Sequence, residues 1–413
     1  MQVMITRQPF AAGFRLLVAL ICLVACTDPT SQGQAVRPGI DVLLADSIHL
    51  VAAKRVGLLT NQTGVDRAGV SDVDRLLQAG VELTALFSPE HGFRGVLEQA
   101  TIGHATDSAT GLPIFSLYGE QREPTAEMLA MIDVLLVDLQ DIGARPYTYI
   151  STILLTLRAT AAAGVPALIL DRPNPIGGLQ VQGPVLEPEF ASFVGMLPVP
   201  LRHGLTIGEL ALFGDDVLEI GADLTVVPAD GWQRELWHDQ TGLPWVRPSP
   251  NMPDLESATH YPGTVLFEGT NLSVGRGTTI AFQVLGAPWL DPSDILAAVG
   301  QEPGVELSDT VVVPHAPSDG KYPDIALPAL RLRVIDRASY DPTRLAVRLL
   351  GAISQLHPDS FEIRNARYFD NRAGSAAIRD WLDGEPPRAE IWRLWERDLA
   401  EFRRARQPHL IYE

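Results

Sequence analysis

A glutamate and a histidine lie side by side in the run Ser88-Pro89-Glu90-His91-Gly92, and Arg94 follows closely. The run comes directly after residues 82–87, an apolar stretch typical of a buried strand. A carboxyl group in such a loop can protonate a leaving oxygen when partial burial favours its neutral form. The alternative is a loop carboxylate that forms an ion pair with Arg94. We favour the catalytic interpretation for Glu90.

Polar residues follow each of four predicted strands. These strands are expected at 55–60, 82–87, 133–139 and 166–170, with helices at 72–79 and 151–163. Apolar strands that alternate with helices predict a parallel sheet covered on both faces. The carboxyl ends of parallel strands meet at one edge, where ligands bind in such folds. The polar residues expected at that edge are Asn61, Gln62, Glu90, His91, Gln140, Asp141, Arg145, Tyr147, Tyr149, Asp171, Arg172 and Asn174.

Carboxylates, amides, arginines and tyrosines in one place are typical of a site for a polar ligand or a carbohydrate. For any single residue the alternative is a helix cap or a turn, because Asn, Asp and Pro often fill those roles. For the whole set, a binding site is the better interpretation.

Glu268 and Arg276 stand among glycines further along the chain, where tight turns let an arginine face a ligand. Cleavage of a glycosidic bond generally uses two carboxylates, and Glu268 is the candidate for the second. Its competitors are Asp138, Asp141 and Asp171. Of these, Asp138 lies inside an apolar strand and is expected to be a structural, hydrogen-bonded acid.

The pattern changes near residue 255. Before it come a predicted helix at 207–219 and a strand at 224–228, and after it come an alternating strand at 327–335 and amphipathic helices at 344–356 and 389–404. We therefore predict a Rossmann-like, doubly wound α/β domain at 40–255 and a smaller α+β domain at 256–413.

The N-terminus has the features of an export signal. Arg7 and Arg15 precede an apolar run, residues 16–25, which ends at Cys26. The sequence around Cys26 resembles a bacterial lipoprotein box, so we predict a signal peptide at 1–25 and a lipidated tether at 26–39. The alternative is an ordinary signal peptide. The protein is then exported, periplasmic or at the cell surface, and meets the membrane only through the lipid.

Composition excludes several classes of function. A net charge of −18 disfavours nucleic acid as a partner. The only cysteines are Cys22 and Cys26, and the histidines are scattered, so neither a disulfide framework nor a metal site is expected. No Gly-x-Gly-x-x-Gly follows the first strand and no Gly-x-Ser-x-Gly elbow occurs, so no cofactor is expected.

Six motifs together resemble the exo-β-N-acetylmuramidase family. They are GLLTNQTGVD (57–66), LFSPEHGFRG (86–95), DLQDIGARPYTYIST (138–152), LDRPNP (170–175), PSPNMP (248–253) and FEGTNLSVGRGT (267–278). The resemblance implies a Rossmann-like domain with a C-terminal auxiliary domain and an active site in the cleft between them. It also implies release of N-acetylmuramic acid from the non-reducing ends of peptidoglycan fragments. The family's proposed catalytic glutamate corresponds to Glu90.

The implied sugar carries a lactyl carboxylate, which a guanidinium binds well. Arg94, Arg145 and Arg276 are the candidates for that contact. Its 2-acetamido group can also attack the anomeric carbon, in which case the second carboxylate only orients the amide. The catalytic residues expected are Glu90 with Glu268 or Asp141; the substrate contacts are Asn61, His91, Arg94, Arg145, Tyr147, Tyr149, Asp171, Asn174, Asn271 and Arg276.

Two other functions suit parts of the sequence. A lipid-anchored protein that binds muropeptides without cleaving them also combines a lipoprotein signal with α/β domains. Against it, the C-terminal third does not alternate strands and helices as a second binding lobe does. An esterase or amidase is disfavoured by the missing nucleophile elbow and zinc pattern.

Overall fold

The computed structural model describes residues 35–95, 103–384 and 390–413. The predicted signal peptide, Cys26 and most of the predicted tether lie outside these residues. None of the helices that the structure describes is both long and apolar enough to cross a membrane.

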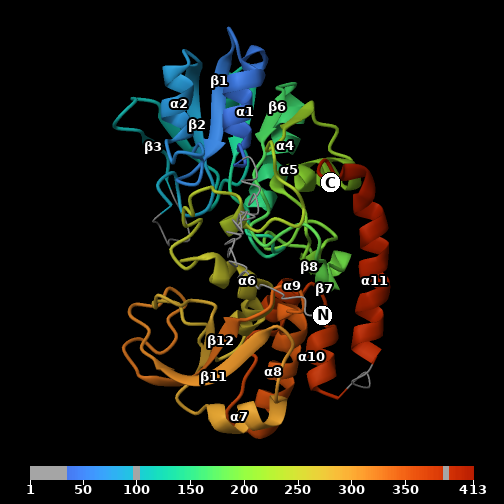
Figure 1. Ribbon diagram of the computed structural model, residues 1–413. Helices are drawn as coiled ribbons and strands as arrows, with labels where there is room; N and C mark the ends of the chain where they lie inside the picture. Colours follow the sequence, from blue (N-terminus) through green and yellow to red (C-terminus); the bar gives the residue numbers. More distant parts are fainter. Residues whose placement is uncertain (1–34, 96–102, 385–389) are drawn as a thin grey trace, which may run out of the picture. The chain divides into compact units, whose positions relative to one another are not determined.

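A seven-stranded sheet forms the centre of the first part of the chain (Figure 1). Its strands are β1 (Arg55–Thr60), β2 (Glu82–Ser88), β3 (Ala105–Thr106), β4 (Pro113–Ser116), β5 (Val134–Asp138), β6 (Ala167–Leu170) and β9 (Leu224–Val227). The order is β3-β4-β2-β1-β5-β6-β9, and every neighbouring pair is parallel except β3 with β4. The predicted α/β class with a parallel sheet is confirmed.

Helices cover both faces of this sheet. They are α1 (Gly39–Asp46), α2 (Asp72–Gln78), α3 (Ala126–Leu129), α4 (Tyr149–Ala163) and α5 (Ile207–Val217). Leu58 of β1 packs in one apolar cluster with Leu43 of α1 and Leu76 of α2, whereas its neighbour Leu59 packs in another with Leu154 of α4. Because successive strand residues point to opposite faces, α1 and α2 lie on one face and α4 on the other.

The strand order reverses at β1. The chain passes from β1 to β2 on one side and later returns to β5 on the other side, where Thr60 pairs with Asp138. Ligands of α/β proteins bind outside the carboxyl ends of the strands at such a reversal. The residues that follow β1, β2, β5 and β6 are therefore brought to one edge of the sheet.

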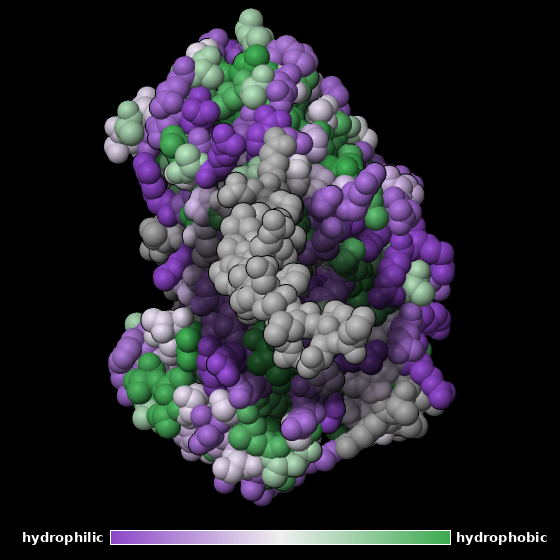
Figure 2. All heavy atoms as spheres, in the orientation of Figure 1, coloured by the Kyte–Doolittle hydropathy of each residue, from purple (hydrophilic) through white to green (hydrophobic). Residues whose placement is uncertain are grey.

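The later part of the chain contains a three-stranded antiparallel sheet in the order β10-β12-β11. Its elements are α6 (Leu255–Thr264), β10 (Val284–Gly286), α7 (Pro292–Val299), β11 (Val305–Val312), β12 (Leu327–Val334), α8 (Pro342–Leu356), α9 (Ala366–Ala373) and α10 (Ala377–Leu382). A ribbon of β7 (Gln182–Val185) and β8 (Pro200–Arg202) packs against the last helix, α11 (Glu390–Arg406). Hydrophilic residues cover most of the outer side of α11 (Figure 2).

The earlier and later parts of the chain share one apolar core. Tyr147, which follows β5, packs edge-on against Tyr261 of α6 with ring centres 6.0 Å apart. The end of the chain returns to the first sheet, where the Tyr412 hydroxyl donates a 2.6 Å hydrogen bond to Asp171 and accepts one from the backbone of Ala229. The domain boundary at 255/256 remains a prediction, and it falls at the start of α6.

Candidate active site

Glu90 lies in the turn that follows β2, at the edge described above. His91 and Gly95 adopt left-handed backbone conformations in this turn, with φ of 70° and 67°. A Cβ atom at Gly95 would lie 1.9 Å from the side chain of Gln62, so this position requires glycine. Gln62 in turn donates a 2.7 Å hydrogen bond to the carbonyl of Arg247. The loop that carries Glu90 is thus packed closely against the end of β1.

Both carboxylate oxygens of Glu90 accept a hydrogen bond from a hydroxyl group. The Tyr118 hydroxyl donates to Oε1 at 2.8 Å, and the Thr148 hydroxyl donates to Oε2 at 2.5 Å. Tyr118 follows β4, and Thr148 is the N-terminal cap position of α4. Burial and the charge of Glu90 raise the pKa of Tyr118, so the phenol keeps its proton and remains a donor.

Arg94 does not pair with Glu90. Its guanidinium forms a 3.0 Å ion pair with Asp107, and no Lys or Arg of the described residues lies within salt-bridge distance of Glu90. The alternative of a Glu90–Arg94 ion pair is therefore wrong. Glu90 is held by the hydroxyls of Tyr118 and Thr148 and not by a guanidinium.

Asn61, Tyr147 and Tyr149 form a buried layer behind Glu90. The Asn61 amide donates a 2.8 Å hydrogen bond to the Tyr149 hydroxyl, which donates to the carbonyl of Pro248. The rings of Tyr147 and Tyr149 are 4.9 Å apart. Desolvation raises the pKa of Tyr149, and the charge of Glu90 adds to that effect. Asn61 and Tyr149 are thus bonded to each other and to the backbone, whereas the Tyr147 hydroxyl has no hydrogen-bond partner among the described residues; substrate contacts by these three residues remain a prediction.

The aspartates after β5 and β6 have internal partners. Asp141 accepts a 2.6 Å hydrogen bond from the backbone of Gly143 and lies 3.4 Å from His203. Asp171 is fully buried and accepts hydrogen bonds from the backbone of Arg172 and Gly208 and from the hydroxyls of Thr206 and Tyr412. Four donors fill the acceptor capacity of a carboxylate, so the structure leaves Asp171 no lone pair for a sugar.

Asp138, Asn174 and Asn271 are also satisfied inside the protein. Asp138 pairs with Arg172, whose Nη2 lies 3.0 Å from Oδ2. Asn174 donates to the carbonyl of Leu205 and accepts from the backbone of Ile176. Asn271 bonds the backbone of Ser360 and Glu362. In the structure, Asn174 and Asn271 stabilise loops through hydrogen bonds to the backbone. This is the alternative role expected of asparagine in turns.

Arg145 is buried in the protein interior. Its guanidinium donates to the carbonyls of Pro184 and Val199 at 2.9 Å and of Arg372 at 2.8 Å. Desolvation lowers its pKa to about 9. The expectation that Arg145 binds the lactyl group is not supported, because its guanidinium is buried on three carbonyls and links β7 and the residue before β8 to α9.

Glu268 is held between two arginines. Arg276 donates to Oε1 through Nε at 2.9 Å and through Nη2 at 2.5 Å, and Arg372 donates to Oε2 at 3.1 Å. Burial alone would raise the pKa of Glu268, but the charges and hydrogen bonds of the two arginines lower it to about 2. Glu268 is therefore ionised near neutral pH, and its pair of cations makes it unsuitable as a proton donor.

Aromatic rings connect the Glu90 region with the Glu268 region. Tyr261 packs against Tyr147 on one side and against Phe282 on the other, with ring centres 4.8 Å apart in the second pair. The guanidinium of Arg276 lies 5.2 Å from the centre of the Phe282 ring. The charges of both Glu268 and Glu90 raise the pKa of Tyr261, although desolvation is the larger cause.

The sequence patterns did not identify four residues of this region. Thr148 lies inside a recognised motif but was not singled out, because threonine at a helix start is common. Tyr118 follows β4, a short strand that begins with a proline. Arg372 lies 104 residues after Glu268. Lys321 lies in the segment between β11 and β12, and no motif around it indicated a function; it is one of only two lysines in the chain.

A separate cavity of about 880 Å³ lies between α7, α8 and α10. Trp381, Trp392, Arg344 and Arg348 are among its lining residues, and none of the groups around Glu90 or Glu268 contributes to it. Within the described ranges, no group of three or more His, Cys, Asp or Glu side chains is arranged to hold a metal ion.

Comparison with known proteins gives consistent matches over nearly the whole chain. Two family models match, described as exo-beta-N-acetylmuramidase NamZ, N-terminal, at 56–256 and C-terminal at 259–412. The peptidoglycan beta-N-acetylmuramidase NamZ of Bacillus subtilis (strain 168) is 41% identical over 410 residues, which are 98% of each chain.

Two solved structures of DUF1343 family proteins from Bacteroides fragilis are also similar. One is 35% identical with a TM-score of 0.85, and the other is 31% identical with a TM-score of 0.73. Each alignment covers 92% of this chain and 99% of the other.

Proposed function

Since the chain belongs to the NamZ family of exo-β-N-acetylmuramidases, we propose that Glu90 is the general acid of its reaction. The enzyme is an exo-acting glycoside hydrolase that releases N-acetylmuramic acid from non-reducing ends. Peptidoglycan fragments are its substrates, as the name of the Bacillus subtilis relative indicates.

The arrangement of Glu90 between two hydroxyls carries this proposal. Its carboxyl group is half-buried, lies at the ligand-binding edge of the sheet and has no arginine or lysine partner among the described residues. Hydroxyl groups can donate to a carboxylate and accept from a carboxylic acid. Tyr118 and Thr148 can therefore hold the side chain in place both before and after it gives its proton to the leaving oxygen.

The surroundings of the other acids favour a substrate-assisted reaction. Asp171 and Glu268 accept internal donors on both carboxylate oxygens. Asp141 instead accepts one from Gly143 through Oδ2, and its buried Oδ1 has no hydrogen-bond partner among the described residues, so Asp141 is the acid left to orient the acetamido group. The 2-acetamido group of the substrate can attack its own anomeric carbon while Glu90 protonates the leaving oxygen. Water then opens the cyclic intermediate, with Glu90 as the base.

The lactyl carboxylate fits best beside Arg276. Arg145 is excluded by its burial on three carbonyls, and Arg94, although its side chain is 69% exposed, pairs one to one with the carboxylate of Asp107 and so leaves no excess charge. Arg276 and Arg372 share the single carboxylate of Glu268, so this cluster keeps one excess positive charge. Both guanidinium side chains remain partly exposed, at 22% and 12%. A planar guanidinium can bind a carboxylate through two parallel hydrogen bonds.

A release assay tests the proposal. The full chain is incubated with a chromogenic β-N-acetylmuramide and, separately, with the N-acetylglucosaminide that lacks the lactyl group. We expect release from the muramide only, and a loss of at least about 100-fold in kcat for Glu90→Gln. A Glu90→Gln protein with normal turnover would contradict the assignment. Sugar binding without release by the wild-type chain would favour the muropeptide-binding alternative.

We also propose that the protein is exported and lipidated on Cys26, after cleavage of residues 1–25. The basic and apolar pattern of residues 7–26 supports this. Metabolic labelling with a radioactive fatty acid should mark the wild-type protein and a Cys22→Ala variant but not a Cys26→Ala variant. Equal labelling of the two variants would disprove this anchor.

A further inference from the structure

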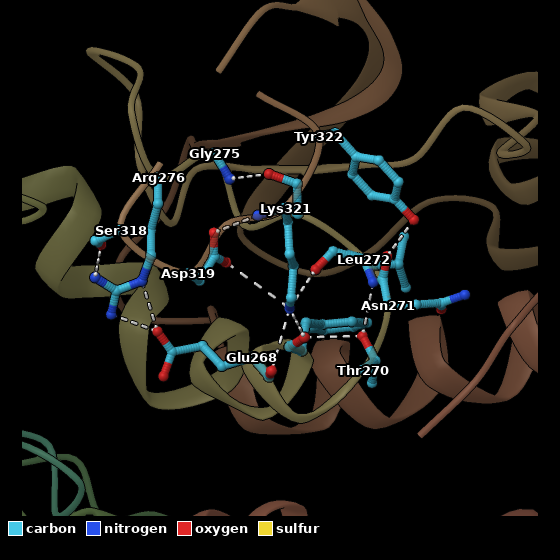
Figure 3. A network of polar contacts seen from close by, with 12 residues as sticks. Glu268, Thr270, Asn271, Leu272, Gly275, Arg276, Ser318, Asp319, Lys321 and Tyr322 are labelled. Atoms are coloured by element: carbon cyan, nitrogen blue, oxygen red, sulfur yellow. Dashed lines mark hydrogen bonds and ion pairs between the residues drawn. The ribbon is translucent and has the colours of Figure 1, made fainter. Parts of the chain in front are cut away.

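A buried lysine lies directly behind the segment that carries Glu268. Lys321 is in the turn between β11 and β12 and is 3% exposed. Its ammonium donates to the backbone carbonyls of Phe267, Glu268 and Leu272, at 3.2, 3.1 and 2.8 Å (Figure 3). A protonated lysine has three N–H donors, so each is directed at one carbonyl.

These carbonyls belong to one end of a short 3-10 helix and to the chain just beyond it. The helix, η4 (Val265–Gly269), ends one residue after Glu268. Carbonyl groups at a helix end have no partner within the helix, and a cation placed there both satisfies and fixes them. Figure 3 shows the backbone carbonyl of Glu268 turned toward Lys321 while its carboxylate reaches Arg276.

The turn that carries Lys321 also holds neighbouring parts of the cluster. The Tyr322 hydroxyl donates a 2.8 Å hydrogen bond to the carbonyl of Asn271. The hydroxyl of Ser318 accepts a 3.2 Å hydrogen bond from Nη1 of Arg276. This turn therefore fixes both the backbone beneath Glu268 and the outer edge of the Arg276 guanidinium (Figure 3).

We propose that Lys321 is a positioning residue for substrate recognition, which holds Glu268 so that Arg276 and Arg372 face the lactyl carboxylate of the sugar. This inference rests on the proposed function. The nearest carboxylate oxygen, on Asp319, is 3.9 Å from the ammonium, so the three carbonyls of the Glu268 segment are its closest partners. A lysine suits the role because its compact ammonium directs three N–H bonds from a single nitrogen, whereas a guanidinium spreads its donors over a wider plane.

Recognition should then depend on the charge of Lys321. The charged groups that face it are Asp319, Glu268, Arg364 and Arg276. Desolvation lowers its pKa to about 8, although Asp319 and Glu268 oppose that effect. A neutral amine has only two N–H donors and a lone pair that repels the third carbonyl. Muramide binding should therefore weaken as the pH rises through about 8.

The kinetic test compares Lys321→Met and Lys321→Arg with Lys54→Met, which changes the only other lysine of the chain. We expect Lys321→Met to raise KM for the muramide at least about tenfold while kcat falls less than about threefold. Inhibition by N-acetylglucosamine, which has no lactyl group, should be unchanged. Lys321→Arg should restore only part of the affinity. The wild-type KM should rise above about pH 8, whereas that of Lys321→Met should not.

A second measurement does not require a stable variant. Lysine labelled with ¹³C at Cε gives one NMR signal for Lys321 and one for Lys54 in the wild-type protein. N-acetylmuramic acid should shift the Lys321 signal and raise its titration midpoint, and N-acetylglucosamine should do neither.

The outcomes separate the two proposals. An inactive wild-type chain refutes the proposed function. If the wild-type chain is active, three results would each overturn the Lys321 proposal. Lys321→Met could keep normal affinity for the muramide, it could lose affinity for both sugars equally, or the Lys321 NMR signal could stay unchanged when N-acetylmuramic acid is added.

Discussion

The hydroxyl of Tyr118 donates a 2.8 Å hydrogen bond to Oε1 of Glu90 across the ends of two neighbouring strands. β2 and β4 are parallel partners, so the residues that follow them emerge at the same edge of the sheet. This contact links the proposed general acid to a side chain 28 positions away. Thr148 completes the support from the N-terminus of α4.

Removal of the Tyr118 hydroxyl should slow the reaction without abolishing it. One hydrogen bond to a charged group contributes about 1.5–3 kcal/mol, so we expect kcat of Tyr118→Phe to fall roughly 10- to 100-fold. KM should change little, because the contact orients the acid and does not bind the sugar. Steady-state kinetics on the muramide test this. Tyr340→Phe, which loses a buried hydroxyl whose partner is His260, is the matched control; a KM effect alone in Tyr118→Phe would argue for direct sugar binding.

Glu268→Gln distinguishes a structural carboxylate from a catalytic one. If Glu268 only holds Arg276 and Arg372, the substitution should raise KM and leave kcat within about tenfold, whereas loss of a reacting carboxylate would lower kcat about 100-fold or more. The folded pKa of about 2 lies below the ordinary value of 4.5. Glu268 therefore stabilises the fold above about pH 4.5 by ~3 kcal/mol, and this is lost as the pH falls toward about 2.

Urea unfolding at about pH 3 and about pH 6 measures this stabilisation. The difference between wild type and Glu268→Gln should be larger at the higher pH. An equal difference at both pH values would show that the two arginines do not lower the pKa of Glu268.

Arg145 should prove to be a stability residue. Arg145→Met leaves the carbonyls of Pro184, Val199 and Arg372 without their donor, while it also removes a buried charge. We expect a net loss of about 2–4 kcal/mol in the free energy of unfolding. The folded fraction should keep its KM for the muramide. Arg158→Met, at an exposed position of α4, should stay within about 0.5 kcal/mol of wild type.

The sequence predicted the elements whose signals are local. β1, β5 and β6 are short apolar runs between polar or glycine-rich segments, and they were predicted to within a residue or two. Because these strands and β2 were predicted to be parallel, the loops after them, including the loop of Glu90 after β2, were expected at one edge of the sheet. β4 was missed because it is a four-residue strand that starts with Pro113.

Side-chain direction was the part that the sequence did not reveal. Arg145 follows β5, yet its guanidinium reaches α9 through the core. Asp171 follows β6, yet the last residues of the chain cover it. Arg372 meets Glu268 only because η4 and α9 pack together. Such contacts depend on tertiary packing between segments far apart in the sequence, for which no local pattern exists.

Asp171 should make the fold less stable as the pH rises from about 4 to about 6. Desolvation raises its pKa to about 6, against the opposing hydrogen bonds of Tyr412, Thr206 and Gly208. Because the folded pKa lies above the ordinary value of 3.8, the folded state binds more protons in this window, and its stability falls with pH. The penalty approaches ~3 kcal/mol above about pH 6.

Asp171→Asn cannot ionise, so its stability relative to wild type should improve over this window. Urea unfolding at about pH 4 and about pH 6.5 measures the change, with Asp359→Asn at an exposed position as the control. A wild-type-minus-variant difference that is independent of pH would mean that Asp171 is ionised throughout, held so by its four donors.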